Sequence, residues 1–271
     1  MIFRIATWNI NSIRLRLAQV LQYLQFFSAD ILCLQETKCP DSLFPVEAFR
    51  AAGYKHILLS GQKSYNGVAI VSRLPFKKVE KRFFCQKQDC RYISVIVEVY
   101  GKSVRIHNFY VPAGGDVPDA EINEKFRHKL NFLEEMSAIR ADQGDGLSSL
   151  LLGDLNIAPL PEDVWSHQQL LKVVSHTPIE TERLQTLCHH GGWVDLMRMH
   201  IPVPAKLYTW WSYRARDWVL ADRGRRLDHI WSSPDLVPFV AGLSIFREAR
   251  GWNQPSDHVP VQTVFDFSRR F

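Results

Sequence analysis

Two short apolar segments most constrain how this chain can fold. Each contains few polar residues and is followed directly by an acidic residue. Residues 29–35 read ADILCLQ and stop at Glu36, and residues 149–153 read SLLLG and lead into Asp154. Apolar runs of this length are typical of strands that are buried on both faces. Such strands need a covering layer on each side, which indicates sheets packed against helices or against a second sheet.

Further strands and helices are predicted along the whole chain. Apolar residues at helical spacing predict helices over residues 17–27 and 126–136. Additional strands are predicted at residues 3–8, 67–72, 91–100, 104–111, 207–213, 226–232, 242–246 and 259–267. The Pro and Gly breaks are short and scattered, without a linker-like tract. We therefore expect one domain over residues 1–271, an α/β fold with two packed sheets and helices outside.

Composition narrows the class of protein. The chain has 271 residues, of which 46% are hydrophobic and 23% charged, so a folded protein is expected and not a disordered one. The formal net charge of +5 favours an anionic partner, although only weakly. The five cysteines are odd in number and not tightly paired, which predicts free thiols in a reducing compartment. Without a targeting segment, a bilayer-length apolar run or a heptad stripe, we expect a cytoplasmic monomer that does not interact with membranes.

Polar residues with metal-binding and acid–base chemistry lie at the ends of predicted strands. Several buried carboxylates that converge are most simply explained by a bound cation, and hard oxygen ligands suit magnesium or manganese. Any one of these residues taken singly could instead cap a turn, and for residues 154–156 the turn is an equal alternative. The convergence of all five segments favours the cation. These residues are Asn9, Glu36, Asp154 with Asn156, Asp228, and Asp257 with His258.

A magnesium site with few carboxylates leaves positions for water and for phosphate oxygens, which is suited to phosphoester hydrolysis. His258, directly after Asp257, would add a cationic or hydrogen-bonding group for the same phosphate charge.

Seven short motifs together resemble those of the exonuclease III family, the bacterial exodeoxyribonuclease III and apurinic/apyrimidinic (AP) endonuclease enzymes of base-excision repair. They occur in the family's order from residue 7 to residue 258, so the resemblance covers nearly the whole chain. It implies a four-layered α/β sandwich, two facing mixed sheets flanked by helices, with the site at one edge of the sheets. The motifs are TWNIN at 7–11, LQETK at 34–38, YNGVA at 65–69, NFYVP at 108–112, GDLNI at 153–157, RRLD at 225–228 and PSDH at 255–258.

The resemblance also implies a role for each matching residue. Glu36 would be the main ligand of Mg²⁺, for which Mn²⁺ would substitute, with Asn9 and Asp257 close by. Asp154 would activate the attacking water or protonate the leaving oxygen, and Asn156 would help to orient Asp154. Both residues would also belong to the metal site. Tyr110 would contact the scissile phosphate, and His258 would bond a phosphate oxygen while Asp228 fixes its ring. Asp154 and His258 are both candidates for the general base.

Two basic stretches are candidates for DNA contact. The stretch with Lys77, Lys78, Lys81, Arg82, Lys87 and Arg91 is interpreted as a solvated surface. Residues 208–226 interleave aromatics with arginines, and their TWWSYR sequence at 209–214 is similar to the family's aromatic segment near the abasic pocket. Here Trp210 and Arg214 are the preferred contacts, with Trp210 favoured over Trp218. The loop that carries Lys63, Tyr65 and Asn66 resembles a DNA-facing family loop, in which Gly67 would permit close backbone approach.

Two positions need separate treatment. Asn11 stands where some relatives carry a metal-shell aspartate, so a ligand role is not assigned to it. His176 lies in a segment that differs among family members near the pocket, where it could favour either 3′-end trimming or abasic-site cleavage. An ordinary surface histidine is the preferred interpretation of His176.

The expected function is a Mg²⁺-dependent DNA phosphodiesterase of base-excision repair: an abasic-site endonuclease, 3′-to-5′ duplex exonuclease and 3′-end trimming enzyme. Its partner would be double-stranded DNA with abasic sites or 3′ ends. One alternative is a relative that hydrolyses inositol phosphates, sphingomyelin or messenger poly(A), but the RGRRLD and WWSYR segments favour DNA. Another is a non-catalytic DNA-binding protein, which would have lost one of the catalytic or ligand residues; Glu36, Asp154, Asn156, Asp257 and His258 are all present.

Overall fold

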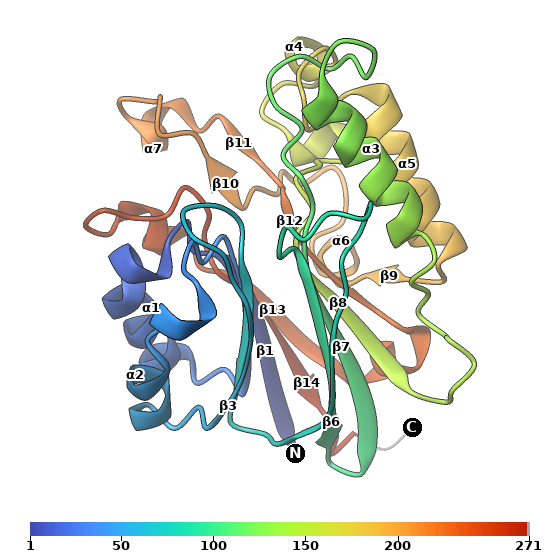
Figure 1. Cartoon of the computed structure of the whole chain (residues 1–271). Helices are drawn as coiled ribbons and strands as arrows, with labels where there is room; N and C mark the ends of the chain where they lie inside the picture. The colour runs from blue at the N-terminus through green and yellow to red at the C-terminus, as the bar shows by residue number, and fades with distance from the viewer. Residues whose placement is uncertain (270–271) are drawn as a thin grey trace.

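The computed structural model describes residues 1–269 as two facing six-stranded sheets with helices on both outer faces (Figure 1). The first sheet has the strand order β13-β14-β1-β2-β4-β3 and the second has the order β5-β6-β7-β8-β12-β9. In each sheet one pair is parallel, β1 with β2 and β7 with β8, and the other pairs are antiparallel. This arrangement confirms the expected four-layered α/β sandwich of mixed sheets.

The strands of the first sheet are β1 Ile2–Asn9, β2 Ile31–Gln35, β3 His56–Ser60, β4 Val68–Ser72, β13 Val240–Ile245 and β14 Val261–Asp266. Those of the second are β5 Phe76–Lys81, β6 Tyr92–Val99, β7 Lys102–Tyr110, β8 Ser148–Asp154, β9 Val194–Asp195 and β12 Asp228–Ser232. A separate two-stranded ribbon pairs β10 Trp210–Trp211 with β11 Gly224–Arg225.

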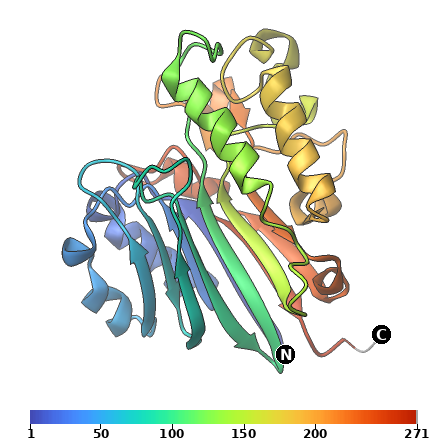
Figure 2. The same cartoon turned by 45° about the vertical axis from the view of Figure 1, so that its right-hand side comes forward.

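The helices are α1 Ile13–Phe27, α2 Val46–Ala51, α3 Glu124–Met136, α4 His167–Leu170, α5 Pro178–His190, α6 Leu196–His200 and α7 Trp218–Ala221. Figure 1 shows α1 and α2 beside the first sheet, and the turned view in Figure 2 shows α3 and α5 over the second. No helix within residues 1–269 is long and apolar enough to cross a membrane.

Successive residues of the central strands belong to different hydrophobic layers. In β2, Ile31 and Cys33 pack between the two sheets, whereas Leu32 and Leu34 pack beneath α1. Strand β8 follows the same rule, because Leu150 and Leu152 face the first sheet and Leu151 faces the layer under α3 and α5. A strand between two apolar layers has no solvent-facing side, which explains the continuous apolar segments in the sequence.

Most of the predicted strands are present within a few residues of their expected bounds, and the prediction over residues 207–213 is wrong. Only Trp210 and Trp211 pair there as a strand. The aromatic side chains that suggested a longer strand pack on one another across the loop instead, since Trp211 contacts Tyr208 and Trp218 edge to face. Strands β3 and β5 were not anticipated. Strand β5 is an exposed edge rich in lysine, which has no apolar alternation to detect.

Candidate active site

The polar residues at the strand ends converge at one edge of the two sheets. Asn9 ends β1, and Glu36 directly follows β2, which runs parallel to β1. Asp154 ends β8 in the opposite sheet. The Asn9 amide Nδ2 donates to Glu36 Oε1 at 2.9 Å and to Asp154 Oδ2 at 2.8 Å, so one buried side chain joins the carboxylates of the two sheets. The predicted meeting of these three residues is therefore present in the structure.

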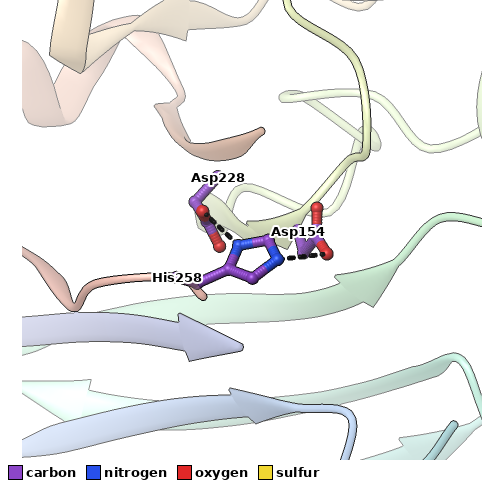
Figure 3. A group of neighbouring side chains, drawn as sticks. All are labelled: Asp154, Asp228 and His258. Atoms are coloured by element: carbon purple, nitrogen blue, oxygen red, sulfur yellow. Dashed lines mark hydrogen bonds and ion pairs between the residues drawn. The ribbon is translucent and has the colours of Figure 1, made fainter. Parts of the chain in front are cut away.

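His258 lies between two carboxylates (Figure 3). Its Nδ1 donates to Asp228 Oδ2 at 2.8 Å, and its Nε2 lies 3.7 Å from Asp154 Oδ2. Asp228 reaches this place because antiparallel pairing of β12 with β8 sets it directly opposite Asp154. All three residues are buried, and one ligand atom from each lies within 4.8 Å of the others. The bond to Asp228 orients the imidazole so that Nε2 faces Asp154.

Burial and charge shift the proton affinities of this group. Burial raises the pKa of Asp154, and the carboxylates of Asp228 and Glu36 raise it further, against the lowering effects of His258 and Asn9. Burial alone would lower the pKa of His258, but Asp228 and Asp154 outweigh it and raise that pKa to about 10. A carboxyl with a raised pKa therefore lies beside an imidazolium.

Glu36 and Asp257 are partly buried carboxylates whose pKa values are nevertheless lowered. Burial disfavours their charge, yet Lys38 and Asn9 hold the pKa of Glu36 below its usual value. The pKa of Asp257 is likewise lowered, because His258, Trp210 and Asn11 outweigh burial. Lys38 Nζ lies 2.8 Å from Glu36 Oε2 and also donates to Asn11.

Asp257 also links the site to its surroundings. It accepts from Asn11 Nδ2 at 3.1 Å and from Trp210 Nε1 at 2.9 Å. Asn11 thus contacts a candidate ligand through a hydrogen bond, while its own oxygen accepts from Lys38.

These residues fit a hard divalent cation. Glu36 and Asp257 are ionised oxygen donors, and both line the same cavity together with Asn156 and His258. Carboxylate and amide oxygens of this kind are the ligands that magnesium and manganese prefer. The donor set therefore agrees with the metal chemistry expected from the sequence.

Tyr110 enters the site from the second sheet. It ends β7, where parallel register pairs it with Asp154, and the charges of Glu36 and Asp154 act on its hydroxyl. Burial, Glu36 and Asp154 raise the pKa of this phenol, although Arg91 has the opposite effect. The guanidinium of Arg91 lies 4.8 Å from the centre of the Tyr110 ring. Tyr110 therefore remains a neutral hydroxyl that can donate a hydrogen bond.

The segment at residues 153–156 is both a turn and part of the site. The Asn156 backbone N–H donates to Asp154 Oδ1 at 2.9 Å, as in an Asx turn, and Asn156 adopts a left-handed φ of 54°. The Asn156 side chain donates to Asp154 Oδ2 at 3.2 Å and to the Val111 carbonyl at 2.9 Å. The turn and catalytic interpretations are therefore compatible, since the turn is what aims Asn156 at Asp154.

A cavity of about 640 Å³ opens beside these residues. Trp210 forms one part of its wall, with the Arg225 guanidinium 5.2 Å from the centre of its ring, and the exposed Arg214 also lines it. Trp218 contributes as well, so both tryptophans considered from the sequence lie here. Aromatic faces and arginines thus surround the cavity next to the carboxylates.

The loop that carries Lys63, Tyr65 and Asn66 adjoins the site without lining this cavity. Lys63 is exposed and the Tyr65 side chain is 71% exposed, which leaves both accessible to a large ligand. The Asn66 carbonyl accepts from the backbone of Lys38, two residues after Glu36. Gly67 has a φ of 94°, and a Cβ there would lie 2.2 Å from the Thr37 hydroxyl. Glycine is therefore required at this position, as expected, but the group that approaches its backbone is Thr37 of the same chain.

The lysines of the other basic stretch form a solvated face, as expected, but Arg91 does not, because its side chain is largely buried beside Tyr110. The lysines on and after β5 are exposed, and Lys77, Lys81 and Lys87 pair with surface carboxylates.

The prediction that His176 is a surface histidine is wrong. His176 is only 2% exposed, bonds the Ala158 carbonyl through Nδ1 at 2.6 Å, and contacts His167 at 2.8 Å.

Sequence reasoning missed a buried ion pair beneath the cavity, Lys129 with Glu180. A signal was available, because Lys129 falls on the apolar stripe of α3 that includes Phe126, Leu130 and Leu133. A charged residue on the buried face of a helix requires a partner.

Two facing sheets with a buried carboxylate–histidine site at one edge define a hydrolase of the four-layered α/β sandwich class. Residues 6–258 match the sequence profile of the Endonuclease/Exonuclease/phosphatase family, and the chain belongs to this family. It is 28% identical to Exodeoxyribonuclease III of Haemophilus influenzae, over 96% of this chain and 98% of that protein.

Solved structures extend the likeness. An AP endonuclease from Archaeoglobus fulgidus has a TM-score of 0.88 and 32% identity, covering 97% of this chain and 99% of that one. The 3′ phosphatase NExo from Neisseria, solved with a product DNA hairpin, has a TM-score of 0.89 and 32% identity, covering 98% and 100%. These comparisons confirm the resemblance to the exonuclease III family.

Proposed function

We propose that this chain is a magnesium-dependent DNA phosphodiesterase of base-excision repair that incises at abasic sites, degrades duplex DNA from 3′ ends and trims blocked 3′ ends. The observation that carries the proposal is the Asn9 amide, which joins Glu36 and Asp154 beside the His258–Asp228 pair. This arrangement gathers ionised oxygen donors, a proton-binding carboxyl and a cationic imidazole around one small volume. Each of the three can contribute to phosphodiester hydrolysis, through metal binding, proton transfer and stabilisation of phosphate charge.

DNA as the substrate is supported by the relatives and by the surface around the cavity. The relatives include an exodeoxyribonuclease III, an AP endonuclease and a 3′ phosphatase with bound DNA. Beside the site, Trp210 and Arg214 line the cavity, and Lys63 and Tyr65 are exposed on the adjoining loop. Arginine and lysine bind phosphates while aromatic rings stack on bases. We assign these four residues, with Asn66, to DNA binding.

The metal would be held by Glu36 and Asp257, with Asn9, Asp154 and Asn156 completing its surroundings. Bound there, Mg²⁺ would neutralise phosphate charge and stabilise the leaving oxygen, and Mn²⁺ would serve in its place. The lowered pKa values of Glu36 and Asp257 support this assignment, because ionised carboxylates are the stronger ligands for a hard cation.

The chain's own residues divide the remaining chemistry. Asp154, with its raised pKa, takes a proton from the attacking water or gives one to the leaving oxygen, and Asn156 orients it. Tyr110 donates its hydroxyl proton in a hydrogen bond to a phosphate oxygen. His258 binds another phosphate oxygen as an imidazolium, held by Asp228. A ring with its pKa raised to about 10 has no free nitrogen to accept a proton near neutral pH, so Asp154 is favoured over His258 as the general base.

The proposal treats residues 1–271 as one domain that acts as a cytoplasmic monomer. Support for the single domain comes from the core between the sheets, which draws on strands from β1 to β14. Support for a reducing compartment comes from the five cysteines, all of which are free thiols.

A side-by-side assay of one preparation tests the proposal. Duplexes with an abasic site, a recessed 3′ end or a 3′-phosphate are incubated with Mg²⁺, and we expect turnover of all three. EDTA should abolish cleavage, and Mg²⁺ or Mn²⁺ should restore it. Cleavage of none of the duplexes, or full activity in excess chelator, would contradict the proposal.

Salt dependence separates DNA from a small phosphoester substrate. Contacts to several phosphates release counterions, so DNA affinity should fall steeply between about 50 and 200 mM salt, and the slope of log affinity against log salt should be roughly proportional to the number of phosphates contacted. A flat response together with hydrolysis of inositol phosphates or sphingomyelin would favour a different substrate branch of the family.

A further inference from the structure

The ammonium of Lys129 is buried between three segments of the chain. Lys129 lies on α3 with no exposed surface, and its Nζ donates to the carbonyls of Asn156 at 2.8 Å and Ala113 at 3.2 Å. Its remaining bond goes to the carboxylate of Glu180, which is equally buried. All three N–H donors of the ammonium are thereby used.

Glu180 holds a second set of backbone groups. It lies in the first turn of α5 and accepts from the Ser175 N–H at 3.0 Å to each oxygen. It also accepts from the Thr177 hydroxyl at 2.6 Å and from the Thr177 backbone N–H at 3.2 Å, and the backbone bond is its half of a capping box. One carboxylate therefore fixes both the start of α5 and the loop before it.

The segments held by this pair form part of the cavity wall. Ala113, Asn156 and Ser175 all line the cavity of about 640 Å³. Ser175 has a φ of 88°, a left-handed conformation that serine rarely adopts and that its contacts must maintain. Arg225 also donates to the Ser175 hydroxyl at 2.8 Å. Two charged side chains, Glu180 and Arg225, thus hold the wall at Ser175.

Stability alone is a weak reason for such a pair. Removing two charges from water is costly, and a well-packed apolar pair of similar volume often stabilises a fold equally well or better. The contacts of Lys129 and Glu180 are instead directed at backbone groups next to Asp154. The Asn156 carbonyl held by Lys129 belongs to the residue whose side chain bonds Asp154.

We propose that Lys129 and Glu180 are positioning residues, which set Asn156 and the Ser175 wall relative to Asp154 before substrate arrives. The inference rests on the proposed function, because it concerns the geometry of the same site. Neither residue touches the substrate. Their contribution is to hold the turn at Asn156 against the loop at Ser175, two segments that lie about twenty residues apart in the chain.

The test compares three variants on the abasic duplex under single-turnover conditions at saturating enzyme. Lys129→Met keeps the length of the side chain and removes its donors, and we expect the rate to fall by about 30- to 100-fold, the order expected for a displacement of about 1 Å. Affinity for DNA in EDTA should change less than about threefold, because the exposed DNA-binding residues are untouched. Glu180→Gln, which is nearly isosteric, should lower the rate by a smaller factor.

The double variant Lys129→Met/Glu180→Gln should be no slower than Lys129→Met alone, because both substitutions break the same ion pair between residues 129 and 180. Met136→Ala is the matched control. Met136 is buried on the same helix, about two turns further on, so it should lower the melting temperature and leave the rate per folded molecule within about twofold.

Each outcome is decisive. If Lys129→Met folds and keeps a rate within about twofold of wild type, or if Met136→Ala slows cleavage equally, the positioning role is wrong. If Lys129→Met does not fold, the same criterion applies to Glu180→Gln: a folded variant with a rate within about twofold of wild type refutes the positioning role. Failure of the wild-type protein to cleave any duplex would instead refute the proposed function, so the two failures are distinguishable.

Discussion

Substitutions at Asp228 test how His258 works, because Asp228 is buried and meets the substrate cavity only through that histidine. The bond from His258 Nδ1 to Asp228 Oδ2 measures 2.8 Å, and both side chains are at most 4% exposed. Asp228→Asn keeps an acceptor but removes its charge. Asp228→Ala removes the acceptor and leaves a buried N–H without a partner.

The magnitudes follow from the kind of hydrogen bond lost. A bond to a charged group contributes about 1.5–3 kcal/mol and a neutral one about 1 kcal/mol. The asparagine variant therefore loses about 0.5–2 kcal/mol, or about 2- to 30-fold in rate. The alanine variant loses the whole bond, about 1.5–3 kcal/mol, or about 10- to 150-fold. These losses apply to the rate because His258 interacts most strongly with phosphate charge that develops in the transition state.

The assay is single-turnover cleavage of the abasic duplex, corrected for the folded fraction by circular dichroism. We expect the cleavage rate to decrease in the order wild type, asparagine, alanine, while the enzyme concentration that gives the half-maximal rate changes less than about threefold. Asp142→Asn, on an exposed turn before β8, is the control and should keep the wild-type rate. If Asp228→Ala cleaves as fast as wild type, or faster than Asp228→Asn, the assigned role of Asp228 is wrong.

Three further predictions follow from the same structure. Glu36→Gln removes a charged ligand, so half-maximal cleavage should need at least about tenfold more Mg²⁺ in a metal titration; an unchanged requirement would contradict the ligand role. Gly153→Ala should cost about 3 kcal/mol or more of folding stability in urea unfolding, because its Cβ would lie 1.9 Å from a carbonyl of β7. Gly101→Ala, at a positive φ of 84° but in open space, should cost about 1 kcal/mol, and equal losses would refute the clash. Burial lowers the pKa of His107 to about 3 and of His229 to about 4. Below about pH 6.5 the unfolded chain binds protons that the folded chain does not, so stability should fall by up to about 1.4 kcal/mol per pH unit for each histidine. Urea unfolding at pH 7, 6 and 5 measures this, and a flat profile would exclude it.

The central strands were predictable because burial on both faces leaves a direct trace in the sequence. Strands β2 and β8 lie between two apolar layers, and their residues are apolar without alternation. The edge strand β5 leaves no such trace, since its lysines face solvent. The aromatic segment at Trp210 and Trp211 misled the strand prediction, because aromatic residues that pack on a loop have the same composition as a strand.

The candidate site was predictable in part. Asn9, Glu36 and Asp154 stand out from sequence because each interrupts or follows a buried strand. The partnership of Asp228 with His258 came from the family resemblance, since only the register of β12 against β8 brings Asp228 to the site.

The place of Lys129 on the apolar stripe of α3 signals a buried charge, but nothing in the sequence identifies Glu180 as its partner. These residues are 51 positions apart in the chain, and only the packing of α3 against α5 brings their charges together. Local sequence can show that a charge falls on an apolar face, but not which residue will neutralise it.

The most direct test of the account is cleavage of an abasic-site duplex by Asp154→Asn in the presence of Mg²⁺. This variant keeps the size of the side chain but removes the carboxyl that exchanges a proton, a contribution of about 10²- to 10⁴-fold in rate. We predict that single-turnover cleavage falls by at least about a hundredfold while DNA affinity changes less than about threefold. Cleavage at the wild-type rate would contradict the assignment of this site as the catalytic centre of a DNA phosphodiesterase.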